Sequence, residues 1–157
     1  MNFTQFKKED QAGVSNFWQS IFDEMGWPVK ESDGFDNISR YIHLPDGFLF
    51  LIKDNEKVIG CGGVTPLNSK TGIVKRFYIT RNLRGKGVSK KLLDRIIKES
   101  KKRGIKRLVL DVYFKNLRAS KFYEKYGFTR YNQKPVAKWN QTLTPDKFFY
   151  YKLDITG

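Results

Sequence analysis

The sequence predicts an α+β fold of three layers, in which helices cover both faces of a mixed, largely antiparallel sheet. Two observations point to it: β-type runs in the first half of the chain form hairpins, and strands in the second half alternate with helices. A length of 157 residues is common for one domain, and no linker, repeat or low-complexity stretch divides the chain. We therefore expect a single domain over residues 1–157.

Apolar spacing places the elements of the N-terminal part. After a short strand at 2–6, residues 10–25 carry apolar side chains at helical spacing, and a glycine and a proline end that helix. Its apolar face consists of Val14, Phe17, Trp18, Ile21 and Phe22. A second helix is expected from Ser32 or Asp33 to about His43, with three residues facing inward: Phe35, Ile38 and Ile42.

The rest of the chain reads as a hairpin followed by alternating strands and helices. A turn at 45–47 leads into the hairpin, whose strands at 48–53 and 57–65 are joined by residues 54–56. Further strands are expected at 73–80, 108–113, 128–133 and 147–155, helices from 88 to 103 and from 116 onward, and a loop at 135–145. Gly104 is a typical stop signal for the first of these helices.

The segment between the strand at 73–80 and the next helix is rich in glycine and positive charge: Arg84, Gly85, Lys86, Gly87, Val88 and Ser89. Glycines at the start of a helix let backbone N–H groups approach a ligand, and the helix dipole favours phosphate there. A Walker loop is excluded because no Gly-Lys-Ser/Thr end is present, and Lys90 stands where a dinucleotide fingerprint needs its third glycine. The segment therefore predicts a pyrophosphate-binding loop of another type.

Two motifs resemble those of one enzyme family. Residues 84–89 fit Arg/Gln-x-x-Gly-x-Gly/Ala, with serine in place of the final glycine or alanine. Residues 116–128 fit Asn-x-x-Ala-x-x-Phe-Tyr-x-x-x-Gly-Phe, in the expected order and after a predicted strand. On these motifs the chain resembles the GNAT superfamily of N-acetyltransferases, and the resemblance covers roughly residues 57–128.

The resemblance implies acetyl-CoA as cofactor and a primary amine as acceptor, with direct attack and no covalent enzyme intermediate. The sheet would splay between the strands that end near Ile79 and Tyr113, and the thioester would enter there. The implied cofactor-binding residues are the strand residues Phe77, Tyr78 and Ile79, the loop residues Arg84, Gly85, Lys86, Gly87, Val88 and Ser89, and Asn116. Tyr123 matches the tyrosine proposed to protonate the departing sulfur, although its helical stripe also suits a core residue.

No single residue is indicated as general base. Relatives often place a glutamate two residues before the lysine of the central strand, and here that position is Ile73. Asp111 would act directly or through water unless it faces the core, Glu124 reads as a solvated helix charge, and His43 reads as structural. We therefore expect deprotonation through water without one dominant residue.

Positive charge gathers around the predicted loop. The chain has a net charge of +14, and residues 70–107 hold fifteen basic and two acidic residues. Such a face attracts a polyanion such as coenzyme A, but it also suits a plain solvated helix or a nucleic-acid surface. No helix-turn-helix or RRM signature supports the nucleic-acid module. The other alternative is a non-catalytic domain that binds or senses acyl-CoA.

The composition limits the kinds of site that the protein can hold and indicates where it acts. A single cysteine, Cys61, excludes an internal disulfide and a cysteine-based zinc site, and no metal is expected. No apolar run is long enough to span a membrane and the first residues are polar, so we expect a cytoplasmic protein. The acceptor, a small-molecule or peptide amine, would be selected by the first two helices and the 135–145 loop. Aromatic candidates for this role are Phe17, Trp18, Trp27, Tyr41 and Trp139. The acyl-chain preference and the pairing of two copies as a homodimer stay open.

Overall fold

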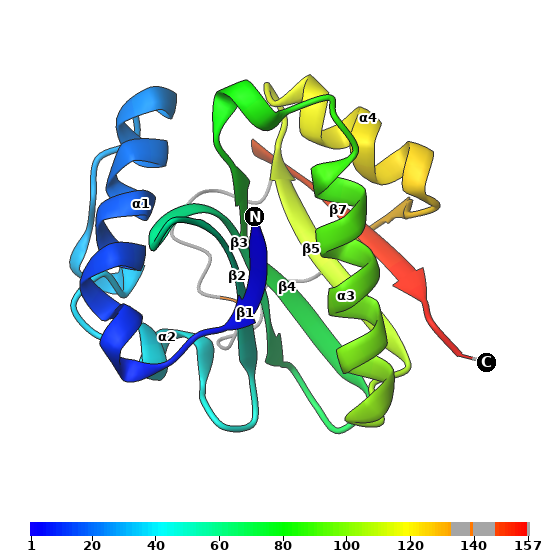
Figure 1. The fold of residues 1–157 in the computed structure, drawn as a ribbon. Coiled ribbons are helices and arrows are strands. Elements are labelled where there is room, and N and C mark those ends of the chain that lie inside the picture. Colours follow the sequence, from blue (N-terminus) through cyan, green and yellow to red (C-terminus); the bar gives the residue numbers. More distant parts are fainter. Residues whose placement is uncertain (133–138, 140–146, 157) are drawn as a thin grey trace. The chain divides into compact units, whose positions relative to one another are not determined.

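The computed structural model describes residues 1–132, 139 and 147–156. Within them one mixed sheet runs in the order β1-β2-β3-β4-β5-β7-β6 (Figure 1). Its strands are β1 Asn2–Gln5, β2 Phe48–Asp54, β3 Lys57–Pro66, β4 Thr71–Ile79, β5 Arg107–Tyr113, β6 Thr129–Tyr131 and β7 Phe148–Asp154. The α-helices are α1 Gln11–Met25, α2 Ile38–Ile42, α3 Val88–Lys102 and α4 Leu117–Tyr126. Short 3-10 turns are η1 Lys8–Asp10, η2 Glu31–Asp33 and η3 Arg81–Leu83.

Strand pairing confirms the predicted mixed and largely antiparallel sheet. The pairs β1–β2, β2–β3, β5–β7 and β6–β7 are antiparallel, whereas β4 and β5 run parallel, from Thr71 opposite Arg107 to Ile73 opposite Val109. The hairpin of β2 and β3 closes through Asn55 and Glu56, whose φ angles of 47° and 71° are those of a two-residue hairpin turn.

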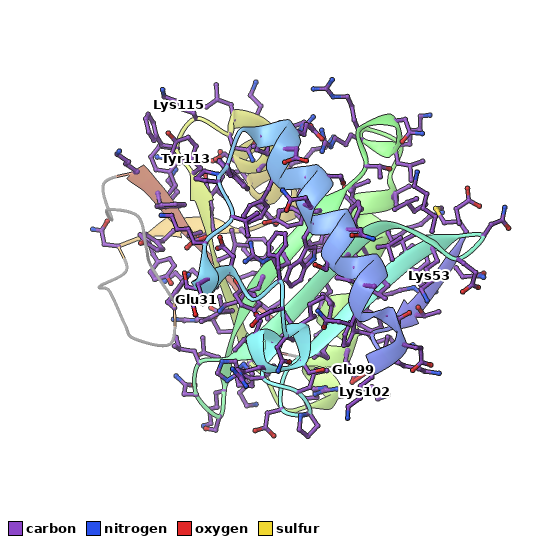
Figure 2. The ribbon with its side chains drawn as sticks, turned by 90° about the vertical axis from the view of Figure 1, so that its left-hand side faces the viewer. Glu31, Lys53, Glu99, Lys102, Tyr113 and Lys115 are labelled. Atoms are coloured by element: carbon purple, nitrogen blue, oxygen red, sulfur yellow. The ribbon has the colours of Figure 1, made fainter. Side chains whose placement is uncertain are left out.

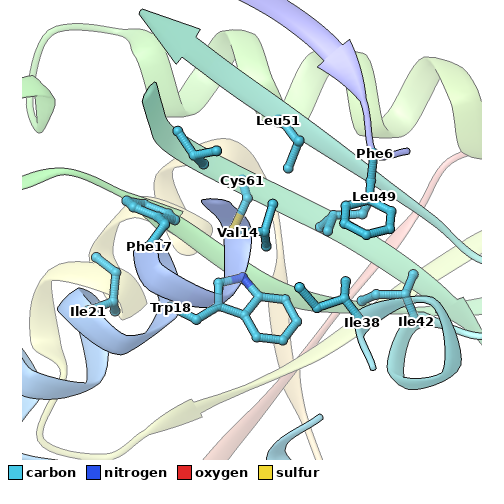
Figure 3. Packing of buried hydrophobic residues seen from close by; sticks show 11 residues of the cluster. Phe6, Val14, Phe17, Trp18, Ile21, Ile38, Ile42, Leu49, Leu51 and Cys61 are labelled. Atoms are coloured by element: carbon cyan, nitrogen blue, oxygen red, sulfur yellow. The ribbon is translucent and has the colours of Figure 1, made fainter. Parts of the chain in front are cut away.

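The chain divides into two compact units, residues 1–65 with 75–96 and residues 66–74 with 97–157. Figure 2 looks onto α1 in the first unit and onto the segment after it, where Glu31 is labelled. The predicted apolar stripe of α1 is fully buried, which confirms that helix. It packs with α2 against inward side chains of β2 and β3 (Figure 3). These are Leu49, Leu51, Val58 and Cys61.

Helix α3 lies on the other face of the first unit's strands. A Cβ added to Gly62 would lie 2.9 Å from Ile96, whereas the neighbouring Cys61 belongs to the cluster under α1. Because successive strand residues point to opposite faces, the first unit has helices on both sides of its sheet. Its α3 stripe is buried as predicted at Val88, Leu92 and Ile96.

The second unit has its own core. One face of β5 and β7 contributes Val109 and Tyr150 to a cluster with Ile73 of β4 and Trp139. On the other face, the phenol of Tyr151 donates a hydrogen bond to Glu124 of α4. Helix α4 therefore covers only one side of these strands.

The predicted second helix differs from the observed one. Gly34, with φ of 79°, ends the short turn η2, and α2 begins only at Ile38. The reason is local capping, since the side chain of Asn37 accepts the N–H of Arg40 at 3.0 Å and starts a new helix. The strand expected at 128–133 is observed only at Thr129–Tyr131. The loop at 135–145 lies outside the described residues apart from Trp139.

No helix in the described ranges combines the length and the apolar character that crossing a bilayer requires.

Candidate functional site

The glycine loop joins β4 to α3 through an open turn. Gly85 and Gly87 have φ angles of 77° and 81°, in the left-handed region that glycine adopts without strain. A Cβ at either position would meet nothing within 4 Å, so the glycines are required by the backbone path and not by close packing. Lys86 between them is exposed. The first N–H groups of α3 have no partner within the helix, and residues 85–87 just ahead of them are exposed.

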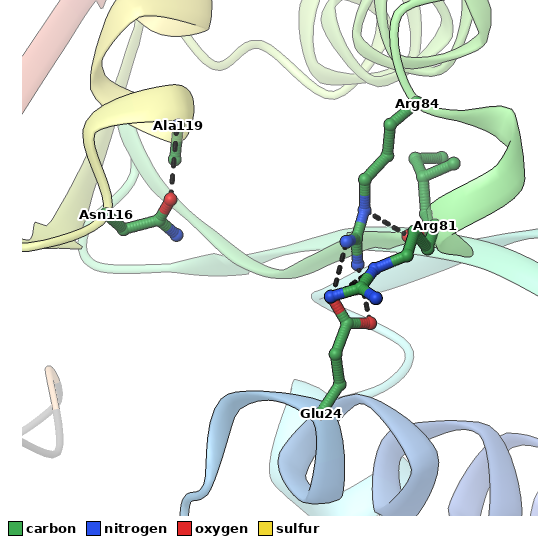
Figure 4. A network of polar contacts seen from close by, with 6 residues as sticks. Glu24, Arg81, Arg84, Asn116 and Ala119 are labelled. Atoms are coloured by element: carbon green, nitrogen blue, oxygen red, sulfur yellow. Dashed lines mark hydrogen bonds and ion pairs between the residues drawn. The ribbon is translucent and has the colours of Figure 1, made fainter.

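Arg84 connects this loop to α1. Its Nε donates to the carbonyl of Ile79 at 3.0 Å, and its two terminal nitrogens donate to the carboxylate of Glu24 at 2.5 and 3.0 Å (Figure 4). Arg81 approaches the same carboxylate at 3.7 Å, but its side chain is 80% exposed against 16% for Arg84. Glu24 therefore offsets the charge that the sequence assigned to phosphate, and Arg84 braces the loop.

The three predicted strand residues differ in their surroundings. Ile79 is buried, while Phe77 and Tyr78 are half-buried. Phe77 points to the α3 side, since its ring would lie 2.8 Å from a Cβ on Gly62. Tyr78 packs against the cluster under α1. The strand thus contributes to both layers around it.

Just before these residues β4 has an irregular backbone. Arg76 has φ of 53°, which is uncommon for a residue other than glycine. Its carbonyl accepts a hydrogen bond from Sγ of Cys61 at 2.9 Å. Burial raises the pKa of the Cys61 thiol to about 12, against smaller lowering effects of Trp18 and Arg76. A thiol of this kind is unreactive at neutral pH, so Cys61 serves as a small buried residue of β3.

In the second unit, Asn116 and Tyr123 belong to α4. The side chain of Asn116 accepts the N–H of Ala119 at 3.2 Å, so it caps the helix (Figure 4). Tyr123 is 7% exposed, and its ring packs edge-on against Phe122 and Phe128 at 5.2 and 5.4 Å between centroids. Tyr123 thus has the core position that its helical stripe also suits, and Asn116 has the structural role of a helix cap.

Asp111 of β5 has aromatic side chains as neighbours. Its Oδ2 accepts the indole N–H of Trp139 at 2.9 Å, and Tyr150 is its partner across the strand pair. Burial, together with the negative charge of Asp111, raises the pKa of the Tyr150 phenol. Sequence reasoning named Asp111 and Trp139 separately but missed their contact, because 28 residues separate them.

The other three candidate positions differ in their surroundings. Ile73 is 1% exposed and belongs to the same cluster as Trp139 and Tyr150. Glu124 is exposed, as expected of a helix charge, and its carboxylate accepts the phenol of Tyr151 at 2.5 Å. His43 ends α2 with φ of 63°. In the described ranges no group of three or more His, Cys, Asp or Glu residues is arranged to hold a metal ion.

Comparison with known proteins agrees with the two motifs. The model of the acetyltransferase (GNAT) family matches residues 14–128. N-alpha-acetyltransferase 30 of Schizosaccharomyces pombe is 30% identical over 97 residues, which are 59% of this chain and 65% of that protein. The chain therefore spans less than two thirds of this relative.

Solved structures share the fold over nearly the whole chain. A GNAT family acetyltransferase from Staphylococcus aureus Mu50 superposes with a TM-score of 0.85 at 21% identity, covering 99% of both chains. A GNAT family acetyltransferase from Elizabethkingia anophelis with acetyl-CoA bound has a TM-score of 0.62 at 18% identity, covering 98% of this chain and 97% of that one. At these identities the likeness establishes the fold.

Proposed function

The chain belongs to the acetyltransferase (GNAT) family, and from that premise we propose that it moves an acetyl group from acetyl-CoA to a primary amine. The observation that carries the proposal is the open glycine turn at the start of α3, where Gly85 and Gly87 leave the backbone accessible. A relative of the same fold has acetyl-CoA bound. The acceptor is a small-molecule or peptide amine.

The proposed cofactor residues divide by the part of acetyl-CoA that they would hold. The loop 84–89 would bind the pyrophosphate through backbone N–H groups, with Lys86 adding charge and Arg84 holding the loop in place through Glu24. The strand residues 77–79 would hold the acyl and pantetheine arm through their backbone. Asn116 would act on the cofactor side while capping α4.

The proposed chemistry is a direct transfer. The amine nitrogen attacks the thioester carbonyl carbon, the carbon–sulfur bond breaks, and the sulfur leaves as a thiolate that takes a proton from the phenol of Tyr123. A backbone N–H of the central strand would stabilise the carbonyl oxygen as its charge develops. The proton lost by the amine passes to water without one dominant residue as base, since Asp111 already accepts the indole N–H of Trp139.

The test is the variant Tyr123→Phe, because it removes only the phenol oxygen from a packed ring. The expected result is a fall in kcat of about 10²–10⁴-fold, the usual contribution of acid catalysis, with the Kd for acetyl-CoA little changed. Thiol release is the assay, and calorimetry gives the Kd. Unaltered turnover across the pH range removes Tyr123 from the mechanism.

A non-catalytic acyl-CoA-binding domain is the second candidate. It is favoured by Ile73, which is apolar and 1% exposed where relatives often have a glutamate. It predicts tight binding of acetyl-CoA and no thiol release with any amine. A panel of amines at saturating acetyl-CoA separates the two functions.

The proposal covers residues 1–157 as one acetyltransferase domain. It is supported by β4 and α3, each of which contributes residues to both compact units. A cytosolic location also belongs to the proposal, because the one cysteine is a free buried thiol and not part of a disulfide.

A further inference from the structure

The guanidinium of Arg76 is enclosed by aromatic rings of the first unit. Its central carbon lies 4.8 Å from the ring centroid of Trp18, 5.1 Å from Phe22, 6.0 Å from Phe35 and 4.5 Å from Tyr41. We call these four residues the Arg76 cage. The rings also pack edge-on against one another, for example Phe22 against Phe35 at 5.0 Å. The cage therefore fixes both the place and the direction of the guanidinium.

The polar edge of Arg76 faces the segment that joins α1 to α2. Its Nη2 donates to the carbonyl of Asp33 at 2.6 Å and lies 3.5 Å from the carboxylate of the same residue. Its Nη1 donates to the phenol of Tyr78 at 3.3 Å. Its Nε is buried and has no hydrogen-bond partner in the part of the chain that the structure describes. The side chain as a whole is 8% exposed.

A purely structural role of Arg76 does not explain why a charged side chain is buried at this position. Burying a charge costs several kcal/mol unless it is paired well, and apolar residues of similar volume often serve a core equally well. Asp33 pairs with Arg76 only loosely, since its other carboxylate oxygen accepts the N–H of Lys30 at 2.7 Å. A guanidinium favours two parallel hydrogen bonds to one carboxylate, and Asp33 does not supply them.

The surroundings of Arg76 connect it with the acceptor side of the proposed reaction. Its own residue comes directly before the strand residues 77–79, and its hydrogen bonds reach the segment after α1. Lys75 adds a second cation, with its Nζ 4.8 Å from the centroid of Tyr41. The cations of Arg76 and Lys75 therefore both contact the ring of Tyr41.

We propose that Arg76 recognises a carboxylate on the acceptor, which takes the place that Asp33 occupies on the guanidinium. The inference rests on the proposed function and narrows its substrate class to amines that carry a carboxylate, such as amino acids. In the absence of the acceptor, the carboxylate of Asp33 lies against the guanidinium of Arg76. An amine of the same shape without the carboxylate lacks this contact.

The test compares amino acids with the matching amino acid amides as acceptors, by thiol release at saturating acetyl-CoA. The wild-type protein is expected to prefer the amino acid by at least about ten-fold in kcat/KM, the factor that one lost charged contact typically gives. Arg76→Lys keeps the charge but loses the planar fork, and it is expected to bring the ratio near one. Arg40→Gln, an exposed arginine of α2, is the matched control and leaves the ratio unchanged.

A second variant, Asp33→Asn, keeps the inference testable if Arg76→Lys fails to fold. Asp33→Asn keeps the Arg76 cage intact and removes the competing negative charge, so the KM for the amino acid is expected to fall several-fold while that for the amide stays constant. Equal use of amino acid and amide by the wild-type protein, or an unchanged ratio in both variants, overturns the inference.

Binding without turnover separates this inference from the proposed function. Calorimetric titration of the CoA-saturated protein with the same amino acids and amides reports recognition of the carboxylate directly. Selective binding of amino acids that Arg76→Lys abolishes, with no thiol release, supports the inference and contradicts catalysis. Turnover together with binding that ignores the carboxylate supports catalysis and overturns the inference.

Discussion

The contact between Arg84 and Glu24 predicts how much the glycine loop contributes to the stability of the protein. Arg84 makes three hydrogen bonds, two of them to the carboxylate, and its side chain is 16% exposed. Hydrogen bonds to charged groups contribute about 1.5–3 kcal/mol each when buried, and partial exposure reduces this, so Arg84→Gln is expected to lower the free energy of unfolding by about 2 kcal/mol. For a chain of this size the melting temperature then falls by about 4–8 °C.

Arg81 supplies the matched control. It approaches the same carboxylate at 3.7 Å but is 80% exposed, so Arg81→Gln is expected to change stability by less than about 0.5 kcal/mol. Thermal unfolding followed by circular dichroism measures both variants. Glu24→Gln should match Arg84→Gln, and the double variant should lose little more than either. Equal losses for the two arginines, or additive losses for Glu24 and Arg84, refute the account of the brace.

Two further predictions concern local stability. Asn116→Ala removes the cap of α4 and is expected to cost about 1 kcal/mol in urea unfolding, whereas Asn116→Asp keeps an accepting oxygen and should cost less. Burial raises the pKa of Asp10, but the hydrogen bond from Lys53 and the N–H of Lys7 outweigh it and hold that pKa below its ordinary value. The folded state thus binds this proton less readily than the unfolded state, so its stabilisation is present at neutral pH and is lost below about pH 4. Asp10→Asn should flatten the stability profile in that acid range, and a profile as steep as that of the wild type contradicts this reasoning.

Much of the fold could be predicted because local sequence and tertiary packing agree. The stripe from Val14 to Phe22 reads as one helical face in the sequence and is that face in the core. The turn at Gly85 and Gly87 was predictable for a different reason, since only a glycine takes a left-handed φ without strain.

The sequence alone did not predict the contacts that join distant residues. Arg76 reads as an ordinary strand cation, and only the fold brings rings from α1, α2 and the segment between them around it. The pairing of Asp111 with Trp139 likewise depends on chain geometry. The second predicted helix was wrong in extent because Phe35 fits the apolar spacing of Ile38 and Ile42, although Gly34 turns the backbone left-handed and the helix begins only at Ile38. The splay of the sheet between the strands ending near Ile79 and Tyr113 stays a prediction.

Calorimetric titration of the protein with acetyl-CoA, beside coenzyme A and ATP, tests the proposed function most directly. Saturable binding of both CoA species and far weaker binding of ATP are expected. Gly87→Val is expected to bind acetyl-CoA more weakly, because a β-branched residue adopts the φ of 81° poorly. Absence of binding at millimolar acetyl-CoA, or equal binding of ATP, contradicts an acetyl-CoA-dependent function.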